Sequence, residues 1–386
     1  MKIIHIYGHT YGGNFVVTQL KELKKQGHDL LVICTGEGSF SNQVINLGIK
    51  VVFIDFQGSR INDVFKIVKS IFTIRKVIRN YSPDVVHYHL IKAILVSRLS
   101  LFFSGVKVKV SELGGPLTLE TKVFKFLDLS TSWVDTDVIC SSEKIKEIYS
   151  NYFWIKSKCS LLHYAFPTSP FTNCNKMNSR ALIRERYGLG SDTFLVGMVA
   201  HMYKSNLKQF NTIGIKGHEV LLSAISKVKL DSKNIHFLIA GQDIDGGIEY
   251  LNELKALAES LELQDLVTFT GHVQDVPEVI ASLDLAVVPS LSENCGGAVE
   301  PLLMGVPVIA SNVGGLPDVV IPDRTGWLVT AKSEFELANA INYACNLTKE
   351  ELGSLGEHGR ELVLSLFEPE KNADKLLKIY SNRLKK

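Results

Sequence analysis

The sequence predicts an α/β protein built from two doubly wound domains. Short β-branched runs alternate with segments of helical periodicity, this alternation stops and restarts near the middle of the chain, and the charge is divided unequally about the same point. Continuous apolar strands of this kind are typical of parallel sheets that are covered by helices on both faces. A length of 386 residues also suits two domains better than one core.

The first half of the chain predicts one such domain. The strand Lys2–Tyr7 is followed by Gly12 and Gly13, and then by apolar residues at helical spacing that end at Gly27. Further strands are expected at Asp29–Cys34, Lys50–Ile54, Asp84–Tyr88, Val106–Val110 and Asp137–Cys140, and helices at about 61–80, 91–103, 118–133 and 142–152.

The second half repeats the pattern after residues 166–180, whose prolines and asparagines predict a linker. Strands are expected at Phe194–Val199, Ile235–Ala240, Val267–Thr270, Leu285–Val288 and Val306–Ala310, with helices near 217–229, 247–261, 275–282, 297–304, 333–347, 350–366 and 370–384. The predicted domains are therefore 1–165 and 181–367, and a helix at about 368–386 is expected to pack back on the first. Two sheets of this kind should face each other across a cleft, with ligands at the carboxyl ends of their strands.

Composition excludes several classes of protein. Residues 1–180 carry 23 Lys/Arg and 13 Asp/Glu, whereas residues 181–386 carry 19 and 27, so the two parts have net charges of +10 and −8. A hydrophobic content of 46% excludes global disorder. No apolar run reaches the roughly 20 residues that span a bilayer, and the N-terminus lacks the pattern of a signal peptide. Six cysteines without a CxxC pair are typical of reduced thiols in the cytoplasm.

The most specific segment runs from Pro289 to Ser311. A buried strand ends at Pro289, a polar loop carries Glu293, and Gly296 and Gly297 open a helix. Free backbone N–H groups and the helix dipole suit an anion such as a diphosphate. Glu300, one turn into the helix, can accept two hydrogen bonds from a sugar diol. The alternative is that Glu293 and Glu300 only cap a helix and line its solvated face. We set it aside because the strand end, the glycines and both glutamates occur in one segment.

This segment resembles the C-terminal signature of GT-B glycosyltransferases, specifically the retaining family 4 (glycosyl transferases group 1), in which two glutamates precede a small-residue helix and Gly-x-Pro-Val-x-Ala. The resemblance covers nearly the whole chain, through Gly12-Gly13 and residues 84–89, 216–218, 270–273, 313–318 and 325–329. It implies a GT-B fold, a nucleotide-sugar bound by the C-terminal domain, an acceptor bound by the N-terminal domain, and sugar transfer with retention.

The resemblance also implies roles for single residues. Glu300 matches the glutamate that binds the ribose, Glu293 the one that contacts the donor sugar, and Lys216 the lysine that neutralises the diphosphate. The predicted catalytic residues are Glu293, Lys216 and His89. An exposed lysine before a helix is the alternative for Lys216. The remaining predicted donor contacts are Asn294, Gly296, Gly297, Gly12, Gly13, His201, Gly271 and Val273.

Three departures from the family pattern stand out. The two motif glutamates are separated by six residues and not by seven. The arginine that usually follows the first strand of the C-terminal domain is absent, and His201, Lys204 or Lys208 could replace it. The acceptor-side histidine is also absent, and Glu112 is the acceptor-side candidate in its place, although its side chain could equally point into solvent.

His89 and the pair Gly12-Gly13 each allow two interpretations. His89 ends a predicted strand, where it could orient a substrate or be a hydrogen-bonded histidine with a structural role. Gly12 and Gly13 allow a close approach of substrate, but a tight turn explains them nearly as well.

No metal site is predicted. Asp135-Thr-Asp137 and Asp243-Ile-Asp245 resemble the Asp-x-Asp of another glycosyltransferase fold, but neither has the right context, so we interpret both as structural. The histidines form no ligand-spaced cluster in the sequence. No cofactor is expected beside the nucleotide-sugar donor.

The basic first half suggests a surface for anionic lipid. The segment Val64–Arg79 places Lys66, Lys69, Arg75, Lys76 and Arg79 among apolar residues, as in a helix that lies on a membrane. An ordinary helix that covers the sheet is the simpler interpretation of this segment alone. No motif supports binding to nucleic acid.

The sequence therefore predicts a retaining, metal-independent glycosyltransferase of bacterial surface polysaccharide biosynthesis, such as capsule or O-antigen. Its acceptor is expected to be a saccharide, lipid-linked by preference, and its place the cytoplasm, at the inner face of the cell membrane. A nucleotide-sugar epimerase of the same fold and a non-catalytic nucleotide-sugar-binding subunit are the alternatives.

Overall fold

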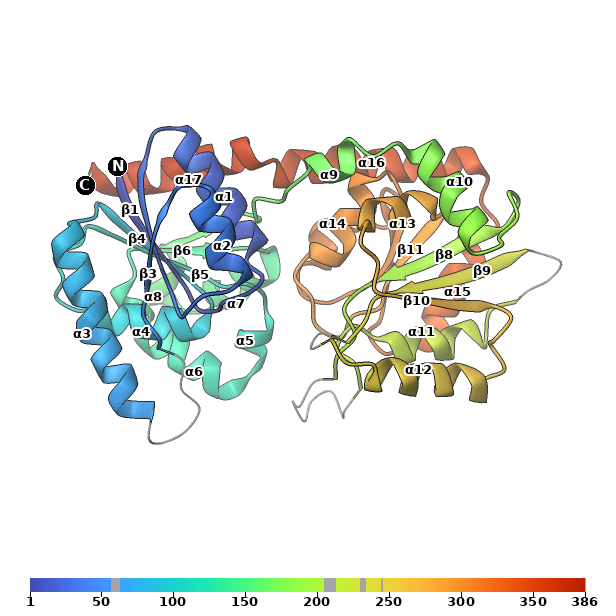
Figure 1. Cartoon of the computed structure of the whole chain (residues 1–386), viewed down its shortest axis with the longest axis horizontal. Coiled ribbons are helices and arrows are strands. Elements are labelled where there is room, and N and C mark those ends of the chain that lie inside the picture. Colours follow the sequence, from blue (N-terminus) through green and yellow to red (C-terminus); the bar gives the residue numbers. More distant parts are fainter. Residues whose placement is uncertain (57–62, 205–212, 230–233, 244–245, 386) are drawn as a thin grey trace. The chain divides into compact units, whose positions relative to one another are not determined.

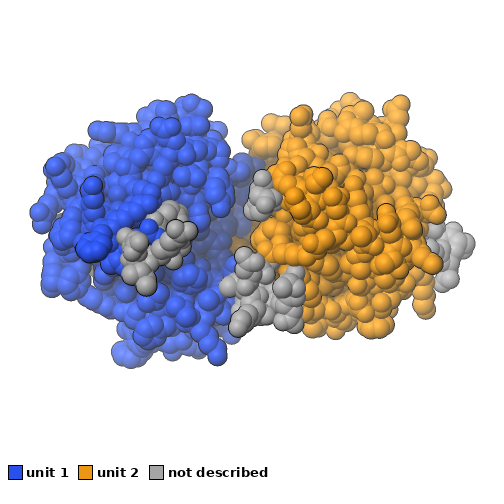
Figure 2. All heavy atoms as spheres, turned by 60° about the horizontal axis from the view of Figure 1, so that its bottom comes forward, with its two compact units in different colours: residues 1–167, 366–386 blue, residues 168–365 orange. Residues whose placement is uncertain are grey.

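The computed structural model describes residues 1–56, 63–204, 213–229, 234–243 and 246–385. The chain forms two compact units: unit 1 comprises Met1–Pro167 and Leu366–Lys386, and unit 2 comprises Thr168–Ser365 (Figure 2). Unit 1 carries 27 Lys/Arg and 16 Asp/Glu, a net charge of +11, and unit 2 carries 15 and 24, a net charge of −9. The unequal charge of the two halves is therefore a property of the two units.

Unit 1 is built on a seven-stranded sheet in the order β3-β2-β1-β4-β5-β6-β7, in which all neighbouring strands are parallel (Figure 1). Its strands are β1 (Lys2–Tyr7), β2 (Asp29–Cys34), β3 (Lys50–Phe53), β4 (Val85–His89), β5 (Val108–Glu112), β6 (Asp137–Cys140) and β7 (Cys159–Leu161). The sequence did not predict β7, because this half-buried edge strand is three residues long and has no apolar run.

Helices cover both faces of this sheet. Val16 and Leu20 of α1 pack on one face, where Leu376 and Tyr380 of α17 join them, and Ile74 of α3 packs in the core on the other face. The helices of unit 1 are α1 (Asn14–Lys25), α2 (Ser39–Asn46), α3 (Asp63–Tyr81), α4 (Ile91–Leu101), α5 (Leu117–Glu120), α6 (Lys122–Thr131), η1 (Ser132–Val134), α7 (Glu143–Ser150), α8 (Phe153–Lys156) and α17 (Pro369–Leu384).

Helix α17 belongs to unit 1 although it lies at the C-terminal end of the chain. Figure 1 shows it beside α1, and its residues Leu376 and Tyr380 are fully buried. Arg383 donates to both carboxylate oxygens of Asp137, at 2.9 and 3.0 Å. Unit 1 therefore contains two segments of chain that are separated in sequence by the whole of unit 2.

Unit 2 contains a six-stranded parallel sheet in the order β10-β9-β8-β11-β12-β13. Its strands are β8 (Phe194–Val199), β9 (Ile235–Ala240), β10 (Val267–Gly271), β11 (Leu285–Val288), β12 (Val308–Ser311) and β13 (Gly326–Val329). Its helices are α9 (Ser169–Thr172), α10 (Lys176–Arg186), α11 (His218–Ile225), α12 (Glu249–Ser260), α13 (Val276–Ser282), α14 (Gly296–Leu303), η3 (Leu316–Asp318), α15 (Glu334–Ala344) and α16 (Lys349–Phe367).

The predicted linker at residues 166–180 is wrong over most of its length. From Thr168 onward the chain belongs to unit 2 and forms α9 and the start of α10. The polar residues that suggested a linker include a helix cap, because the side chain of Asn175 accepts a hydrogen bond from the backbone of Asn178 at 3.2 Å. Arg180 of α10 then binds Asp284 at 2.6 Å.

The strand order of each sheet reverses once, between β1 and β4 in unit 1 and between β8 and β11 in unit 2. Loops from adjacent strands separate at such a point, which leaves room for a ligand at the carboxyl ends of the strands. In the part of the chain that the structure describes, no helix has the length and apolar composition needed to cross a membrane.

The packing of α17 predicts the cost of removing one of its buried side chains. Leu376→Ala should lower the free energy of unfolding by about 2–4 kcal/mol, because it leaves a cavity in the core of unit 1. The exposed residue two positions further on gives a matched control, and Lys378→Ala should change stability by less than about 0.5 kcal/mol. Denaturant unfolding checks both, and equal effects would contradict the assignment of α17 to the core of unit 1.

Candidate functional site

Unit 2 has a pocket of about 250 Å³ at the point where the order of its strands reverses. Residues at the ends of β8 and β11 and at the start of α14 form its wall, together with one lysine from the loop before α11. The lining residues are Met198, Val199, Ala200, His201, Lys216, Val287, Val288, Ser290, Glu293, Gly296, Gly297 and Glu300.

The residues on either side of Lys216 fix its position. The carbonyl oxygen of Ile215 accepts a hydrogen bond from the backbone of Leu291 at 2.8 Å. Gly217 has a φ of +80°, and a Cβ at this position would lie 2.1 Å from the carbonyl oxygen of Pro289. Only glycine allows this approach without a clash. Both contacts tie the Lys216 loop to the loop after β11, which carries Glu293.

Lys216 and Glu293 form an ion pair in the wall of the pocket. Burial by itself would lower the pKa of Lys216, but the charge and hydrogen bond of Glu293, together with Tyr203 and Glu300, raise it, so the lysine is a permanent cation. Glu293 is itself held by the backbone N–H of Asn294 at 3.2 Å and by the hydroxyl of Ser290 at 3.4 Å. A fixed ammonium group of this kind can stabilise the negative charge of a phosphate.

Glu300 lies one turn into α14 and faces the same pocket. Burial raises the pKa of its carboxyl from 4.5 to about 7, and the negative charge of Glu293 adds to this effect while Lys216 opposes it. The ion pair and Glu300 therefore form one electrostatic unit, in which two carboxyl groups share one ammonium.

The start of α14 completes the pocket. Gly296 and Gly297 are its first two residues, and a Cβ at Gly297 would lie 3.1 Å from Cγ1 of Val288. The helix therefore packs closely against the end of β11, with its free N–H groups and positive dipole end at the pocket. This combination of a lysine and a helix N-terminus suits a diphosphate.

Two predicted site residues of unit 1, His89 and Glu112, are buried together. His89 is fully buried, and Glu112 is 2% exposed. Oε2 of Glu112 lies 3.3 Å from Nδ1 of His89 and 3.1 Å from Nε2 of His87. Neither interpretation of Glu112 from the sequence anticipated this position, because its side chain points neither to an acceptor surface nor into solvent.

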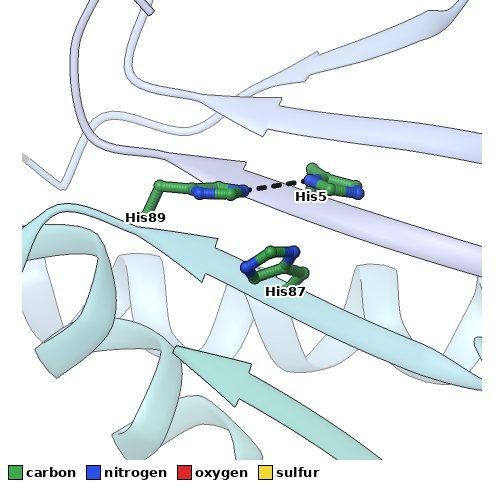
Figure 3. Close-up of side chains that lie close together, drawn as sticks. All are labelled: His5, His87 and His89. Atoms are coloured by element: carbon green, nitrogen blue, oxygen red, sulfur yellow. Dashed lines mark hydrogen bonds between the residues drawn. The ribbon is translucent and has the colours of Figure 1, made fainter. Parts of the chain in front are cut away.

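His5, His87 and His89 form a cluster that the sequence analysis missed. Nδ1 of His5 lies 3.0 Å from Nε2 of His89, and one nitrogen from each of the three rings lies within 4.8 Å of the other two (Figure 3). The expectation that the histidines form no ligand-spaced cluster is wrong. It rested on spacing along the chain, whereas the pairing of β1 with β4 brings His5 beside His87.

Comparison with known proteins identifies the family of this chain. Residues 212–362 match the family model of glycosyl transferases group 1, and residues 7–126 match that of glycosyl transferase 4-like proteins. The chain belongs to the group 1 glycosyltransferases. Its resemblance to this family and its assignment as a glycosyltransferase, both predicted from the sequence, are confirmed, and the fold is GT-B.

Individual relatives cover nearly the whole chain. One is the UDP-Gal:alpha-D-GlcNAc-diphosphoundecaprenol alpha-1,3-galactosyltransferase of Escherichia coli, 23% identical over 93% of this chain and 90% of its own. Another is the capsular polysaccharide biosynthesis glycosyltransferase CapM of Staphylococcus aureus, 23% identical over 100% and 98%. Among solved structures, a glycosyltransferase from Rickettsia africae has a TM-score of 0.83, with 23% identity over 100% of this chain and 98% of its own.

The structure places two of the three candidates for the second cation that the resemblance implies, His201 and Lys204. Burial lowers the pKa of His201, and the nearby Lys216 lowers it further, so the ring is neutral at pH 7. Lys204 forms an ion pair with Glu253 and lies over the ring of Tyr250. Lys208, the third candidate, lies outside the described residues. Among the described residues that line the pocket, Lys216 is thus the one charged cation.

Three other predicted donor contacts, Asn294, Gly271 and Val273, do not line the pocket. Asn294 is buried next to Glu293, and a Cβ at the facing Gly315 would lie 2.8 Å from its side-chain oxygen. Gly271 ends β10 and has a φ of +68°, but neither it nor Val273 lines the pocket. The sequence does not identify Ser290 as a site residue, although Ser290 belongs to the segment Pro289–Ser311 and its hydroxyl lies 3.4 Å from Glu293.

Gly12 and Gly13 precede α1 in unit 1, both with a positive φ. A Cβ at Gly13 would lie 2.8 Å from the ring of Tyr7, so packing alone requires glycine there. At Gly12 the nearest atom, the hydroxyl of Tyr7, would be 3.6 Å away, and the positive φ is the remaining constraint. The tight-turn interpretation therefore accounts for Gly13 without a ligand.

The two Asp-x-Asp segments have structural partners, as the sequence analysis predicts. Asp135 accepts hydrogen bonds from the buried Arg98, and Asp137 from Arg383. Asp243 accepts from the backbone of Tyr250 and Leu251 at the start of α12, at 2.9 and 3.1 Å. Asp245 lies outside the described residues.

Two larger hollows of the glycosyltransferase lie away from the carboxyl ends of the strands. One, of about 800 Å³, is lined by Lys107, Thr136 and Lys158, which precede β5, β6 and β7 and so lie at the amino ends of these strands. The other, of about 760 Å³, lies between α10 and α13, and no lysine or arginine lines it. Neither has the combination of cation, carboxylates and helix start that marks the smaller pocket.

The raised pKa of Glu300 predicts how the stability of unit 2 depends on pH. Between pH 4.5 and about 7 the unfolded chain loses this proton while the folded protein keeps it, so stability falls as the pH rises and the loss is complete above pH 7. Glu300→Gln should therefore be more stable than the wild type at pH 8, by about 1–3 kcal/mol, and similar to it at pH 4.5.

Unfolding curves at several pH values check this expectation. Glu361→Gln, at an exposed position of α16, is the matched control and should show no such difference. A difference between Glu300→Gln and the wild type that stays constant from pH 4.5 to pH 8 would contradict the assignment.

Proposed function

We propose that this glycosyltransferase moves a sugar from a nucleoside diphosphate sugar to a lipid-linked saccharide in the synthesis of a bacterial surface polysaccharide, with retention at the anomeric carbon. The observation that carries the proposal is the grouping of Lys216, Glu293 and Glu300 around the start of α14. Two relatives named for a diphosphoundecaprenol acceptor and for capsular polysaccharide support the acceptor class.

The donor would occupy the pocket of unit 2. Its diphosphate would bind the ammonium of Lys216 and the free N–H groups of α14, and its ribose hydroxyls would donate to the carboxylate of Glu300. The bound diphosphate would partly replace Glu293 as the counter-ion of Lys216. Glu293 would then be free to accept hydrogen bonds from the donor sugar, which makes the ion pair the resting state of the site.

The transfer step needs no group beyond these. The bond between the anomeric carbon and the β-phosphate oxygen breaks as the acceptor hydroxyl attacks the same face of the sugar. The departing phosphate oxygen takes the hydroxyl proton, and Lys216 with the helix N-terminus stabilises the charge that develops on the diphosphate. In this proposal the catalytic residues are Lys216 and Glu293, whereas the buried His89 contacts no substrate.

The contribution of Lys216 can be measured directly. Lys216→Met should lower kcat/KM for the donor by a factor of about 10²–10³, because a preorganised cation is lost from the leaving group. Lys204→Met removes a lysine whose partner, Glu253, does not line the pocket, so this control should keep nearly full activity. Equal activity of the two variants would contradict the proposed diphosphate site.

The reaction class is tested with a panel of UDP-, GDP- and ADP-sugars and a polyprenyl diphosphate saccharide as acceptor. Retention predicts that the product has the anomeric configuration of the donor, which NMR reads directly. Inversion would overturn the proposed stereochemistry. An altered nucleotide-sugar formed without any acceptor would favour an epimerase.

A lipid-linked acceptor requires the protein to reach a membrane surface, and unit 1 has a suitable one. Phe65 and Phe72 of α3 are 86% and 62% exposed, although the opposite side of this helix packs in the core. Phe103, at the end of α4, is 91% exposed. Exposed aromatic side chains in such number are typical of a surface that binds a partner or a lipid bilayer.

The exposed aromatic residues are connected across several elements. The guanidinium group of Arg75 donates to the carbonyl oxygens of Leu99 and Phe102 at 3.0 and 3.3 Å, which joins α3 to the end of α4. The ring of Phe102 lies 5.2 Å from that of Trp133 in η1. Arg75, one of the basic residues of the predicted lipid-binding segment, therefore also holds α3 against the end of α4. The net charge of +11 on unit 1 favours an anionic bilayer as the partner.

Vesicle binding tests this surface. The wild type should sediment with vesicles that contain phosphatidylglycerol, more weakly at high salt, because screening reduces the attraction to the anionic lipid. Phe65→Ser combined with Phe72→Ser should reduce binding several-fold. Phe335→Ser, at a residue of unit 2 that is 64% exposed, should not. Undiminished binding by the double variant would place the contact elsewhere.

A further inference from the structure

The histidine cluster of unit 1 arises from the pairing of two central strands. His5 of β1 lies opposite His87 of β4 in the register of the sheet, and His89 is two residues further along β4. Side chains two residues apart on a strand point to the same face. Figure 3 shows the three rings together, with His89 and His5 joined by the 3.0 Å contact.

The spacing of the ring nitrogens is close to that of a metal site. One nitrogen from each ring lies within 4.8 Å of the other two. Zinc binds imidazole nitrogen at about 2.0–2.1 Å, so neighbouring ligands of a tetrahedral ion are about 3.3 Å apart. The contact of 3.0 Å between His5 and His89 is near this value, and small rotations of the side chains would bring the third nitrogen into range.

Hydrogen bonds among the described residues leave parts of this cluster unsatisfied. All three rings are fully buried, yet Nε2 of His5 has no hydrogen-bond partner among the described residues. Nε2 of His87 and Nδ1 of His89 lie near Glu112, but neither makes a well-directed hydrogen bond in the described structure. Buried polar groups nearly always have a partner, so Nε2 of His5 indicates that the cluster lacks one.

Glu112 supplies the charge and the orientation that such a site requires. Its carboxylate lies beside two of the rings, near Nε2 of His87 and Nδ1 of His89. A metal ion would therefore bind the opposite nitrogens, in place of the hydrogen bonds that these make to Tyr380 and His5. A carboxylate behind a ligating histidine is a common arrangement in zinc proteins. Tyr380 adds an oxygen to the cluster, since its hydroxyl lies 2.7 Å from Nδ1 of His87.

We propose that unit 1 binds one divalent transition-metal ion, Zn²⁺ in the first instance, through His5, His87 and His89, with Glu112 orienting two of the rings. Three imidazole ligands select such a metal over Mg²⁺ or Ca²⁺. Because no ring is exposed, the ion is structural and fastens β1 to β4.

The experiment uses the full-length protein and Co²⁺ as a spectroscopic probe. The protein is treated with a chelator, dialysed and titrated with Co²⁺, and a parallel sample is titrated with Zn²⁺. We expect one Co²⁺ per chain with the visible absorption of a tetrahedral site, and a rise in Tm of about 5 °C with either ion. Metal analysis of untreated protein should find about one ion per chain.

Variants show whether the ion lies in this cluster. His5→Gln and His89→Gln should each lose the Co²⁺ absorption and weaken binding at least 100-fold, and Glu112→Gln should weaken it less. His28→Gln, at a histidine of unit 1 outside the cluster, is the control and should bind as the wild type does.

Two results would overturn the proposal. Wild-type protein that shows neither Co²⁺ absorption nor a change in Tm would show that the cluster holds protons only, whether or not the variants fold. Absorption that persists in folded His5→Gln and His89→Gln would place the metal elsewhere. Neither readout involves sugar transfer, so the result is independent of the proposed function.

Discussion

Parallel strands end at a common edge of a sheet, and the reversal of strand order in each sheet of this protein decides where its chemistry can lie. In unit 2 the reversal separates the loops after β8 and β11 and leaves the pocket into which Lys216, Glu293 and Glu300 project. In unit 1 the corresponding pair, β1 and β4, carries a closed cluster of imidazoles. The same topology thus gives an open polar site in one unit and a sealed one in the other.

Charge balance connects the parts of the donor pocket. A partly buried cation is costly unless a carboxylate faces it, and in this pocket that carboxylate is Glu293. Burial, with the charge of Glu293 added to it, raises the pKa of the second carboxyl, on Glu300, to about 7. An incoming diphosphate would bring two negative charges to a site that has one cation and a helix end, so the net charge of −9 on unit 2 says little about the potential inside the pocket.

The sequence was sufficient for the alternation of strands and helices, because apolar β-branched runs such as Lys2–Tyr7 and Phe194–Val199 carry that signal locally. It was also sufficient for the segment from Glu293 to Glu300, because its two glutamates and two glycines lie close together in the sequence. It failed for Glu112, because the burial of this residue depends on the positions of His87 and His89 on the neighbouring strand. It also failed for Asn175, although its cap is local, because asparagine is common both in linkers and at helix caps.

The position of α17 has a consequence for how the protein is made. Unit 2 is an insertion between two segments of unit 1, so its residues 168–365 leave the ribosome before the segment that completes the core of its neighbour. Unit 2 can close as soon as it has emerged, whereas unit 1 must wait with the apolar surface that Leu376 and Tyr380 later cover still exposed. The first residues to be synthesised are thus among the last to reach their final packing, and chaperones would find their binding surface there.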